Sequence, residues 1–214
     1  MTTPYETIGQ DVTIRPVTKE DIPAIYEVAV IGFGKDIAFE PKHYESQIEK
    51  FPDGQRCVEY DGRIIGASGS LRVSEDQFQV PHKLSDICDN GYIRNHDDSA
   101  PHLYGIEVVV HPDYRHLKVG QKLYEERKQL ARDLQVKSIL IGGRIPNYHK
   151  YQNELTPEQY AEKVIEGELY DPVMTFQLKS GFSFRRILNN YIPEDNESCT
   201  NASLMEWIND EYSP

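Results

Sequence analysis

LYGIEVVVHPDYRHLKVGQKLYEERKQLARDL, residues 103–134, is the stretch that decides the fold. Residues 104–110 are mostly apolar and β-branched, and the run is too short for a helix and ends at His111-Pro112. It is therefore expected to be a buried strand. Residues 119–134 place apolar side chains at helical spacing, and charged residues, among them Arg127 and Lys128, fill the opposite face. The stretch predicts a strand, a turn over residues 112–120 and a helix.

The turn has the properties of a phosphate site. A strand that feeds a helix through such a turn points several unpaired backbone N–H groups and the positive end of the helix dipole at one spot. This turn resembles the acetyl-CoA loop of the GNAT N-acetyltransferases, in which Arg or Gln is followed by two residues, Gly, one residue, and Gly or Ala. The positions that fit the family pattern and its flanks are Val110, Pro112, Arg115, Gly120 and Leu123. Lys118 departs from it, because it occupies the first glycine position, although its charge offers a substitute contact for phosphate.

Length and composition favour one globular domain over residues 1–214. The chain is 38% hydrophobic and carries a net charge of −12, which argues against a nucleic-acid surface and is compatible with a cationic amine substrate. It shows no membrane span, and residues 1–11 lack the features of a signal peptide, so a cytoplasmic location is expected. Three widely spaced cysteines indicate neither a disulfide framework nor a metal site.

The chain before the central stretch predicts a strand over residues 12–17, a helix capped by Thr18, a second helix over residues 41–51 and a hairpin. The hairpin joins residues 56–60 and 63–73 through Asp61-Gly62, the strongest short turn signal in the chain. Residues 74–101 form a long polar connection, which is either a wall of the acceptor site or a surface flap.

The chain after the central helix predicts a buried strand over residues 138–143, parallel to the central strand because a helix crosses between them. Its end, Gly142-Gly143, either permits the close approach of a substrate or backbone or terminates the strand. Helices are expected from Thr156 to about Glu166 and over residues 171–179, and two strands over residues 182–187 and 202–208. These final strands are candidates for pairing in a homodimer.

Residues 176–182, FQLKSGF, resemble the family's F-Y-x-K-x-G-F ending of its last helix. More narrowly, GGRIPNYHKY and LYDPVMTFQLKSGF resemble the acetyltransferase half of two-part bacterial proteins that also carry a nitrilase-type hydrolase, which makes a hydrolase a candidate partner. The resemblance implies an α/β (α+β) fold of the GNAT type. Its central sheet is mixed and mostly antiparallel, a parallel pair of strands splays around the CoA site, and helices cover both faces.

The resemblance also implies how acetyl-CoA is held as a cosubstrate, without a metal ion. Backbone groups of Val108, Val109 and Val110 are expected to pair with the pantetheine amides, and the N–H of Val110 to polarise the thioester carbonyl. The pyrophosphate is expected to meet the amides of the turn, at Arg115, His116, Leu117, Lys118, Val119, Gly120 and Gln121.

Glu107 is the candidate catalytic base, because it is the one carboxylate inside the central strand. Burying such a charge is costly unless it is paired, so Glu107 either points into a cleft, forms a structural ion pair with an arginine or faces solvent. A general acid is harder to assign, because Gln177 stands where the family's last helix usually has Tyr. Tyr148 and Tyr170 are the candidate substitutes, with Tyr151 beside them.

Two functional hypotheses remain at this stage. The first is an N-acetyltransferase that moves an acetyl group from acetyl-CoA to the amine of a small molecule or peptide. The second is a non-catalytic acyl-CoA-binding or regulatory module, which Lys118 and Gln177 favour. A nucleotide-binding fold is disfavoured, because the chain has neither G-x-G-x-x-G nor a P-loop.

Overall fold

A computed structural model describes residues 12–213, so the expectation about a signal peptide, which rests on residues 1–11, falls outside the described residues. Seven strands form one sheet in the order β1-β2-β3-β4-β5-β7-β6. Their bounds are Thr13–Pro16 (β1), Arg56–Tyr60 (β2), Arg63–Val73 (β3), His102–Val110 (β4), Ser138–Arg144 (β5), Ser183–Leu188 (β6) and Ala202–Ile208 (β7). Only β4 and β5 pair in parallel, which confirms the predicted mixed, mostly antiparallel sheet.

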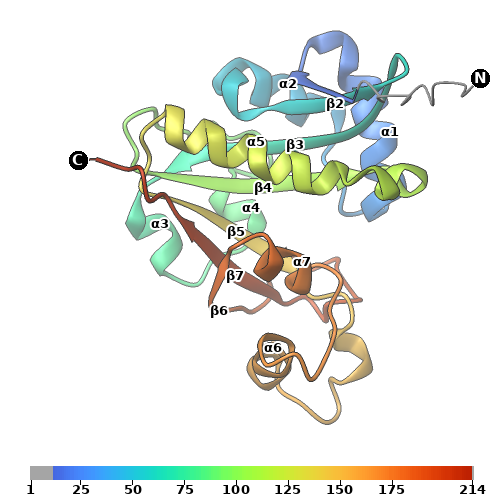
Figure 1. Ribbon diagram of the computed structural model, residues 1–214, viewed down its shortest axis with the longest axis vertical. Coiled ribbons are helices and arrows are strands. Elements are labelled where there is room, and N and C mark those ends of the chain that lie inside the picture. The colour runs from blue at the N-terminus through green and yellow to red at the C-terminus, as the bar shows by residue number, and fades with distance from the viewer. Residues whose placement is uncertain (1–11, 214) are drawn as a thin grey trace, which may run out of the picture.

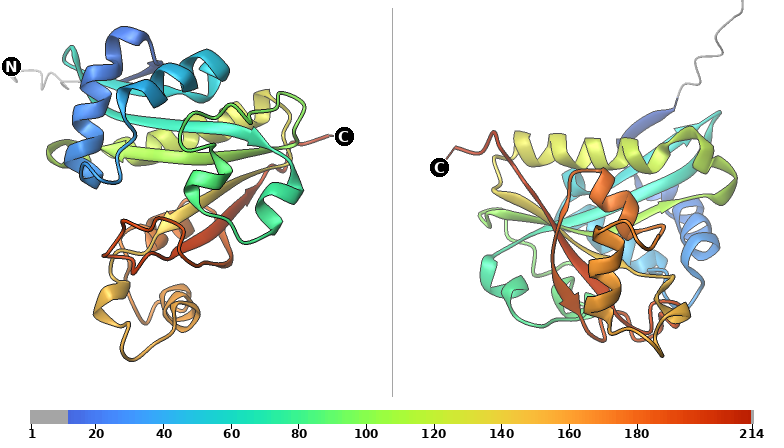
Figure 2. Two further views of the ribbon diagram at one scale, coloured as in Figure 1. Left: turned by 180° about the vertical axis from the view of Figure 1, so that it is seen from behind. Right: turned by 60° about the horizontal axis from the view of Figure 1, so that its bottom comes forward.

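Helices cover both faces of this sheet. Figure 1 shows α5 lying along β3 and β4 on one face, and the view from behind in Figure 2 shows α1 to α4 on the other. The helices are Ile22–Phe33 (α1), Pro41–Lys50 (α2), Glu75–Gln79 (α3), Leu84–Ile87 (α4), Val119–Asp133 (α5), Pro157–Ile165 (α6) and Met174–Lys179 (α7). The short helices α3 and α4 lie in the polar connection over residues 74–101, where the sequence indicated no regular structure.

The last helix starts later than its sequence pattern predicts. The helix expected from residue 171 begins at Met174, because the Asp171 side chain accepts hydrogen bonds from the backbone N–H groups of Val173 and Met174, both at 3.0 Å. Asp171 therefore satisfies donors that a helix start leaves without partners.

The parallel pair separates partway along its length. β4 and β5 pair from His102 and Ser138 to Gly105 and Ile141, after which β4 continues beside β3 and β5 continues beside β7. Figure 1 shows β4 and β5 close together at one end and apart at the other. We call the space between them the wedge, and the Gly105–Ile141 pair its apex.

A β-bulge marks the place where β4 leaves β5. On the β3 side, Gly69 opposes Glu107 while Ser70 opposes Gly105, so Ile106 is the extra residue. A bulge bends its strand and re-aims the side chains next to it. Here it places Glu107 at the start of the diverging segment.

No helix within residues 12–213 combines the length and the apolar character that crossing a membrane would need. The main apolar core lies around the middle of the sheet, with fully buried side chains such as Leu71, Leu103 and Ile139. A second cluster packs α1 and α2 against the sheet, and Gly32 of α1 comes so close to β4 that a Cβ there would lie 2.6 Å from a Val109 methyl group.

Candidate functional site

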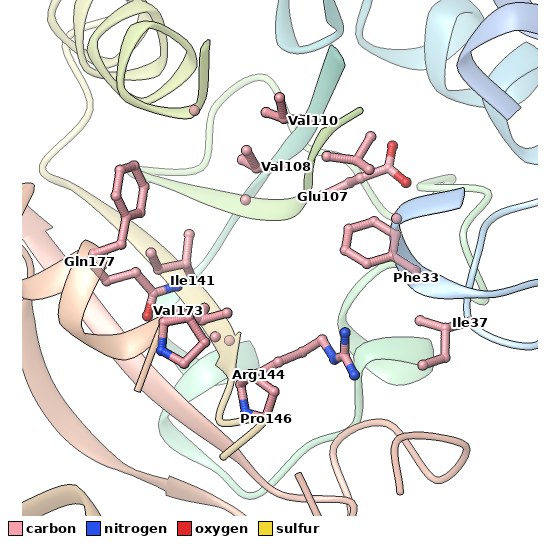
Figure 3. A pocket seen from close by; sticks show the side chains of 18 of the residues that line it. Phe33, Ile37, Glu107, Val108, Val110, Ile141, Arg144, Pro146, Val173 and Gln177 are labelled. Atoms are coloured by element: carbon pink, nitrogen blue, oxygen red, sulfur yellow. The ribbon is translucent and has the colours of Figure 1, made fainter. Parts of the chain in front are cut away.

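The wedge opens into a cavity of about 970 Å³. Figure 3 shows that Glu107, Val108 and Val110 of β4 border one side of it, and Ile141 of β5 with Gln177 of α7 the other. Phe33 and Ile37, at the end of α1 and just beyond it, close a third side, and Arg144 reaches in from the end of β5. A cavity of this size is typical of small-molecule and cofactor sites.

One end of the cavity is formed by the turn that resembles the acetyl-CoA loop. The turn is a 3-10 helix over Pro112–Leu117, followed by Lys118 as the N-cap residue of α5. Lys118 adopts a left-handed backbone with φ +56° and ψ +30°, a conformation that costs a residue with a side chain about 1–2 kcal/mol. The position therefore has the backbone conformation that suits glycine, and it adds a cation beside the helix N-terminus.

The structure places the ten predicted CoA-binding residues in two groups. Seven of them line the cavity: Val108, Val109, Val110, Arg115, Lys118, Gly120 and Gln121. Three do not. Val119 is fully buried against Leu123, Leu117 packs on the same small cluster, and His116 is exposed. The binding roles of all ten remain predictions.

Glu107 is buried, with 7% of its surface exposed, and lines the cavity. The Tyr44 hydroxyl of α2 donates to its Oε1 at 2.9 Å. Burial raises the pKa of Glu107 to about 7, opposed by the Tyr44 hydrogen bond and by the charge of Arg127. Of the three alternatives for this carboxylate, the structure therefore supports a residue that borders a cleft, with a pKa suited to accepting protons near neutrality.

Arg127 corrects the sequence interpretation of α5, which placed it on the exposed polar face. Only 4% of it is exposed, and its guanidinium donates to the carbonyls of Gly69 at 3.0 Å and Glu107 at 2.7 Å. These are the opposed residues at the β-bulge, so Arg127 holds that irregular pairing in place. A Cβ at Gly105 would lie 2.4 Å from the guanidinium, which explains the glycine. Lys128, expected on the same face, is also buried.

Gly142 and Gly143, at the end of β5, leave room for two polar side chains just beyond the apex of the wedge. A Cβ at Gly142 would come within 2.3–2.5 Å of the Tyr191 ring and hydroxyl, and one at Gly143 within 2.3–2.7 Å of the Gln177 amide. The glycine pair therefore serves the close approach of two side chains, rather than of the substrate or backbone that its sequence suggested. Because successive residues of a strand face opposite sides, Tyr191 and Gln177 flank β5 on its two faces.

Gln177 contacts a tyrosine hydroxyl that sequence reasoning did not identify as part of the site. Its Nε2 donates to the Tyr124 hydroxyl of α5 at 3.3 Å, while its buried Oε1 has no hydrogen-bond partner among the described residues. Both side chains line the cavity, and burial raises the pKa of Tyr124, so its hydroxyl keeps its proton. In the sequence, Tyr124 is indistinguishable from a core aromatic residue of an amphipathic helix.

The tyrosines that the sequence suggested as general acids lie elsewhere. Tyr148 is buried outside the cavity lining, and its hydroxyl donates to the Leu155 carbonyl at 3.0 Å. Tyr170 is 64% exposed and is also outside the lining, and Tyr151 packs against Tyr160. These positions argue against proton donation to a thiolate in the wedge by either Tyr148 or Tyr170.

The far side of the cavity combines apolar walls with one ion-pair network. Phe33, Ile37 and Phe39 contribute from the end of α1 and the segment before α2, and Leu84 contributes from the long polar connection, which is therefore part of the wall. Arg144 donates to both carboxylate oxygens of Asp195 at 2.7 and 2.6 Å and to Glu197 at 3.0 Å. Within residues 12–213, no three His, Cys, Asp or Glu side chains are grouped to hold a metal ion.

Comparisons with known proteins agree with this architecture. The model of the "Acetyltransferase (GNAT) family" matches residues 22–151. Two relatives come from Bacillus subtilis (strain 168). "Probable hydrolase YhcX" is 47% identical over 201 residues, which cover 94% of this chain and 39% of that protein. "Uncharacterized N-acetyltransferase YkwB" is 37% identical over 201 residues, which cover 92% of this chain and 88% of that protein.

Two solved structures share the fold. The loading GNATL domain of CurA from Lyngbya majuscula superposes with a TM-score of 0.82 and 21% identity, covering 92% of this chain and 97% of that chain. The GphF GNAT-like decarboxylase in complex with isobutyryl-CoA gives a TM-score of 0.79 and 20% identity, with coverages of 92% and 98%. At these identities the likeness concerns the fold alone.

Proposed function

Because the chain belongs to the GNAT family of acetyltransferases, we propose that it transfers an acetyl group from acetyl-CoA to the amine of a small molecule or peptide. Family membership supports acyl transfer in general, and the acetyl group and the amine acceptor are the finer part of the proposal. The observation that carries it is the wedge cavity, which joins a cationic turn at one end to the buried Glu107, with its pKa of about 7, on the strand leading to the apex.

Acetyl-CoA fits the cavity through charge and through an unpaired strand edge. Arg115 and Lys118 place two cations at the N-terminus of α5, where the helix dipole also favours phosphate. Beyond Gly105, β4 no longer pairs with β5, so the backbone groups of Val108 to Val110 on that edge are available to the pantetheine amides. The thioester is proposed to reach the apex. Val110 is five residues beyond Gly105 on β4, roughly 16 Å away at ~3.3 Å per residue, so its N–H, which the sequence suggested as the donor to the thioester carbonyl, lies too far from the apex for that role.

The proton balance requires a base and an acid. A protonated amine gives up two protons when it becomes an amide, and the departing CoA thiolate takes up one. Glu107 is proposed to accept the first, which frees the nitrogen lone pair for attack, since a pKa near the working pH suits a general base. The Tyr124 hydroxyl, held by Gln177, is proposed to protonate the thiolate, because it lies on the α5 and α7 side of β5.

Two measurements test the proposal. The first is thermal unfolding with acetyl-CoA or CoA, and with ATP and NAD as controls. A ligand at about 100 times its dissociation constant stabilises the fold by ~2.7 kcal/mol, a rise of roughly 5 to 11 °C at this size. The second is release of free CoA thiol on a panel of amines, with the amide identified by mass. No stabilisation by millimolar acetyl-CoA would refute the binding assignment.

The same two measurements distinguish the enzyme from the alternative function, a non-catalytic module. A non-catalytic acyl-CoA-binding module would show the thermal shift but form no amide with any amine in the panel. An enzyme that uses Glu107 would show both, and Glu107→Gln would lower kcat by about 10²–10⁴-fold while retaining the thermal shift.

A hydrolase partner and a homodimer remain proposals. The chain spans 39% of the relative described as a probable hydrolase, so most of that protein lies outside the match. β6 ends the sheet without a further partner strand among the described residues, which would permit pairing with a second copy. Light scattering on the purified chain measures whether two copies associate.

A further inference from the structure

Three buried side chains form a hydrogen-bonded line that reaches the apex of the wedge. His82 Nε2 lies 2.9 Å from the Tyr104 hydroxyl, and that hydroxyl lies 3.1 Å from the Tyr191 hydroxyl. His82 precedes α4, Tyr104 is on β4, and Tyr191 lies in the connection between β6 and β7. They are at most 7% exposed, and Tyr191 lines the cavity. None of them takes part in the chemistry assigned so far.

The line has a defined direction. His82 Nδ1 lies 2.9 Å from the Val80 carbonyl, which can only accept, so Nδ1 carries a hydrogen. Burial lowers the pKa of His82, so the ring is neutral and Nε2 is an acceptor. The Tyr104 hydroxyl must then donate to His82, and the Tyr191 hydroxyl must donate to Tyr104. The Tyr191 oxygen keeps its lone pairs for a donor in the cavity.

The environment of His82 holds this arrangement in place. Arg186 of β6 donates to the carbonyls of Phe78, Gln79 and Val80, the last at 2.9 Å, which fixes the acceptor for Nδ1. Two charges act on the ring with opposite effects on its pKa: the Arg186 guanidinium lowers it, and the Asp86 carboxylate raises it. Both effects are smaller than that of burial, which lowers the pKa most.

Tyr191 is held where the reacting groups are expected to meet. Its N–H donates to the Thr200 carbonyl at 2.7 Å, and its carbonyl accepts from the Leu84 N–H at 2.9 Å. Its hydroxyl lies directly over Gly142, the first residue of β5 beyond the last β4–β5 pair. The open end of the line therefore lies just past the apex, on the face of β5 opposite Gln177.

We propose that Tyr191, Tyr104 and His82 form a proton relay that removes the second proton of the acceptor amine. The inference rests on the proposed amine acetyltransfer, because only that reaction produces a nitrogen with a proton to lose after attack. Glu107 takes the first proton and frees the lone pair. The tetrahedral intermediate then carries a positively charged nitrogen beside the Tyr191 oxygen.

The relay step conserves protons and involves no redox change. An N–H bond of the intermediate breaks and an O–H bond forms at Tyr191, whose own hydrogen passes to the Tyr104 oxygen. The Tyr104 hydrogen passes to His82 Nε2, which makes the ring an imidazolium and leaves both hydroxyls neutral. The C–S bond then breaks and the thiolate takes a proton from Tyr124. When the product has left, the same line returns the His82 proton to water in the cavity, Glu107 releases its proton, and Tyr124 regains one from water, so one proton is released per turnover.

The test uses three hydroxyl deletions in the full chain. Tyr191→Phe and Tyr104→Phe each interrupt the relay, and Tyr160→Phe is the matched control, because Tyr160 is a fully buried tyrosine whose hydroxyl donates to Asp171 outside this line. Tyr191→Phe and Tyr104→Phe are expected to lower kcat by about a hundredfold, the scale of a lost acid–base contribution. Acetyl-CoA affinity should stay close to that of the parent, and the control should retain its kcat.

A proton inventory supplies a readout that a structural role would not move. The kcat of the parent is measured in mixtures of H₂O and D₂O, where several protons moving in one step give a curved dependence. Tyr104→Phe should give a straighter one. If Tyr191→Phe turns over at the parent's rate, the relay is refuted and the acetyltransferase proposal stands. If the parent itself acetylates no amine, both proposals are refuted.

The direction of the line has its own test, which needs no substrate. ¹⁵N NMR of the imidazole is expected to show a neutral His82 with its hydrogen on Nδ1 at neutral pH, and Tyr104→Phe should shift the Nε2 signal. A hydrogen on Nε2, or a ring already charged at neutral pH, would overturn the relay, because Tyr104 would then have no acceptor at His82.

Discussion

Replacing Glu107 by glutamine is expected to make the protein less active and, at alkaline pH, more stable. The amide keeps the shape of the side chain and can still accept the hydrogen bond from Tyr44. It carries no charge, so it removes the cost of an ionised carboxylate in a buried site. It also removes the proposed base, and kcat should fall by about 10²–10⁴-fold.

The size of the stability effect follows from the pKa of Glu107. A folded-state pKa of about 7 against an ordinary value of 4.5 corresponds to about 3 kcal/mol, at about 1.4 kcal/mol per pH unit. Because the folded-state pKa is the higher one, the protonated Glu107 carboxyl contributes this free energy to stability fully below pH 4.5. The contribution is lost as the pH rises through about 7. The glutamine variant has no such dependence, so its stability relative to the parent should increase with pH.

The assay is thermal unfolding of parent and variant at about pH 5 and about pH 8.5. Between the two, the difference in unfolding free energy should change by about 2–3 kcal/mol in favour of the variant, or roughly 5 to 10 °C in Tm. Glu162→Gln, an exposed carboxylate on α6, is the matched control and should show no such change. A difference that moves in favour of the parent with rising pH would mean that Glu107 is held as a paired carboxylate, and the reasoning would fail.

Four further substitutions test other parts of the site. Lys118→Gly should raise the free energy of unfolding by about 1 kcal/mol, because glycine adopts the left-handed backbone at lower cost. The same variant should bind CoA more weakly, and its affinity should depend less on salt, as measured by calorimetry. Arg127→Met should cost about 3–5 kcal/mol in urea unfolding, because it leaves two buried carbonyls without a donor. It should also raise the apparent pKa in the pH profile of kcat/KM, because the Arg127 charge lowers the pKa of Glu107. A lower apparent pKa would contradict the assignment of Glu107 as the base. Gly142→Ala should cost about 1–3 kcal/mol and reduce kcat by displacing Tyr191, and an unaltered kcat would show that Tyr191 does not act at the apex. Tyr124→Phe should lower kcat with little change in CoA affinity; if kcat is unchanged, the thiolate takes its proton elsewhere.

Local sequence patterns were enough to predict most elements of the fold. Periodicity of two or 3.6 residues and turn chemistry act over a few neighbouring positions, so the central strand, α5 and the hairpin at Asp61-Gly62 follow from short windows. The candidate base also followed from a local fact, since Glu107 is a single carboxylate in an apolar strand. Arg127 shows the limit of such patterns, because its place on a helix suggested solvent and its actual partners are carbonyls at a bulge in another element.

The chemistry around Glu107 was decided by tertiary structure. Tyr104 and Tyr191 are 87 residues apart in the chain, and Gln177 and Tyr124 are 53 apart, so no window of sequence shows that their polar atoms meet. They meet because β4 and β5 separate after Gly105 and leave a gap that distant segments fill. The amino-acid sequence by itself determined the central strand, the turn before α5 and the carboxylate within the strand, since these depend on neighbouring residues. Only the packed sheet determined which hydroxyls face them, because that depends on where strands far apart in the chain diverge.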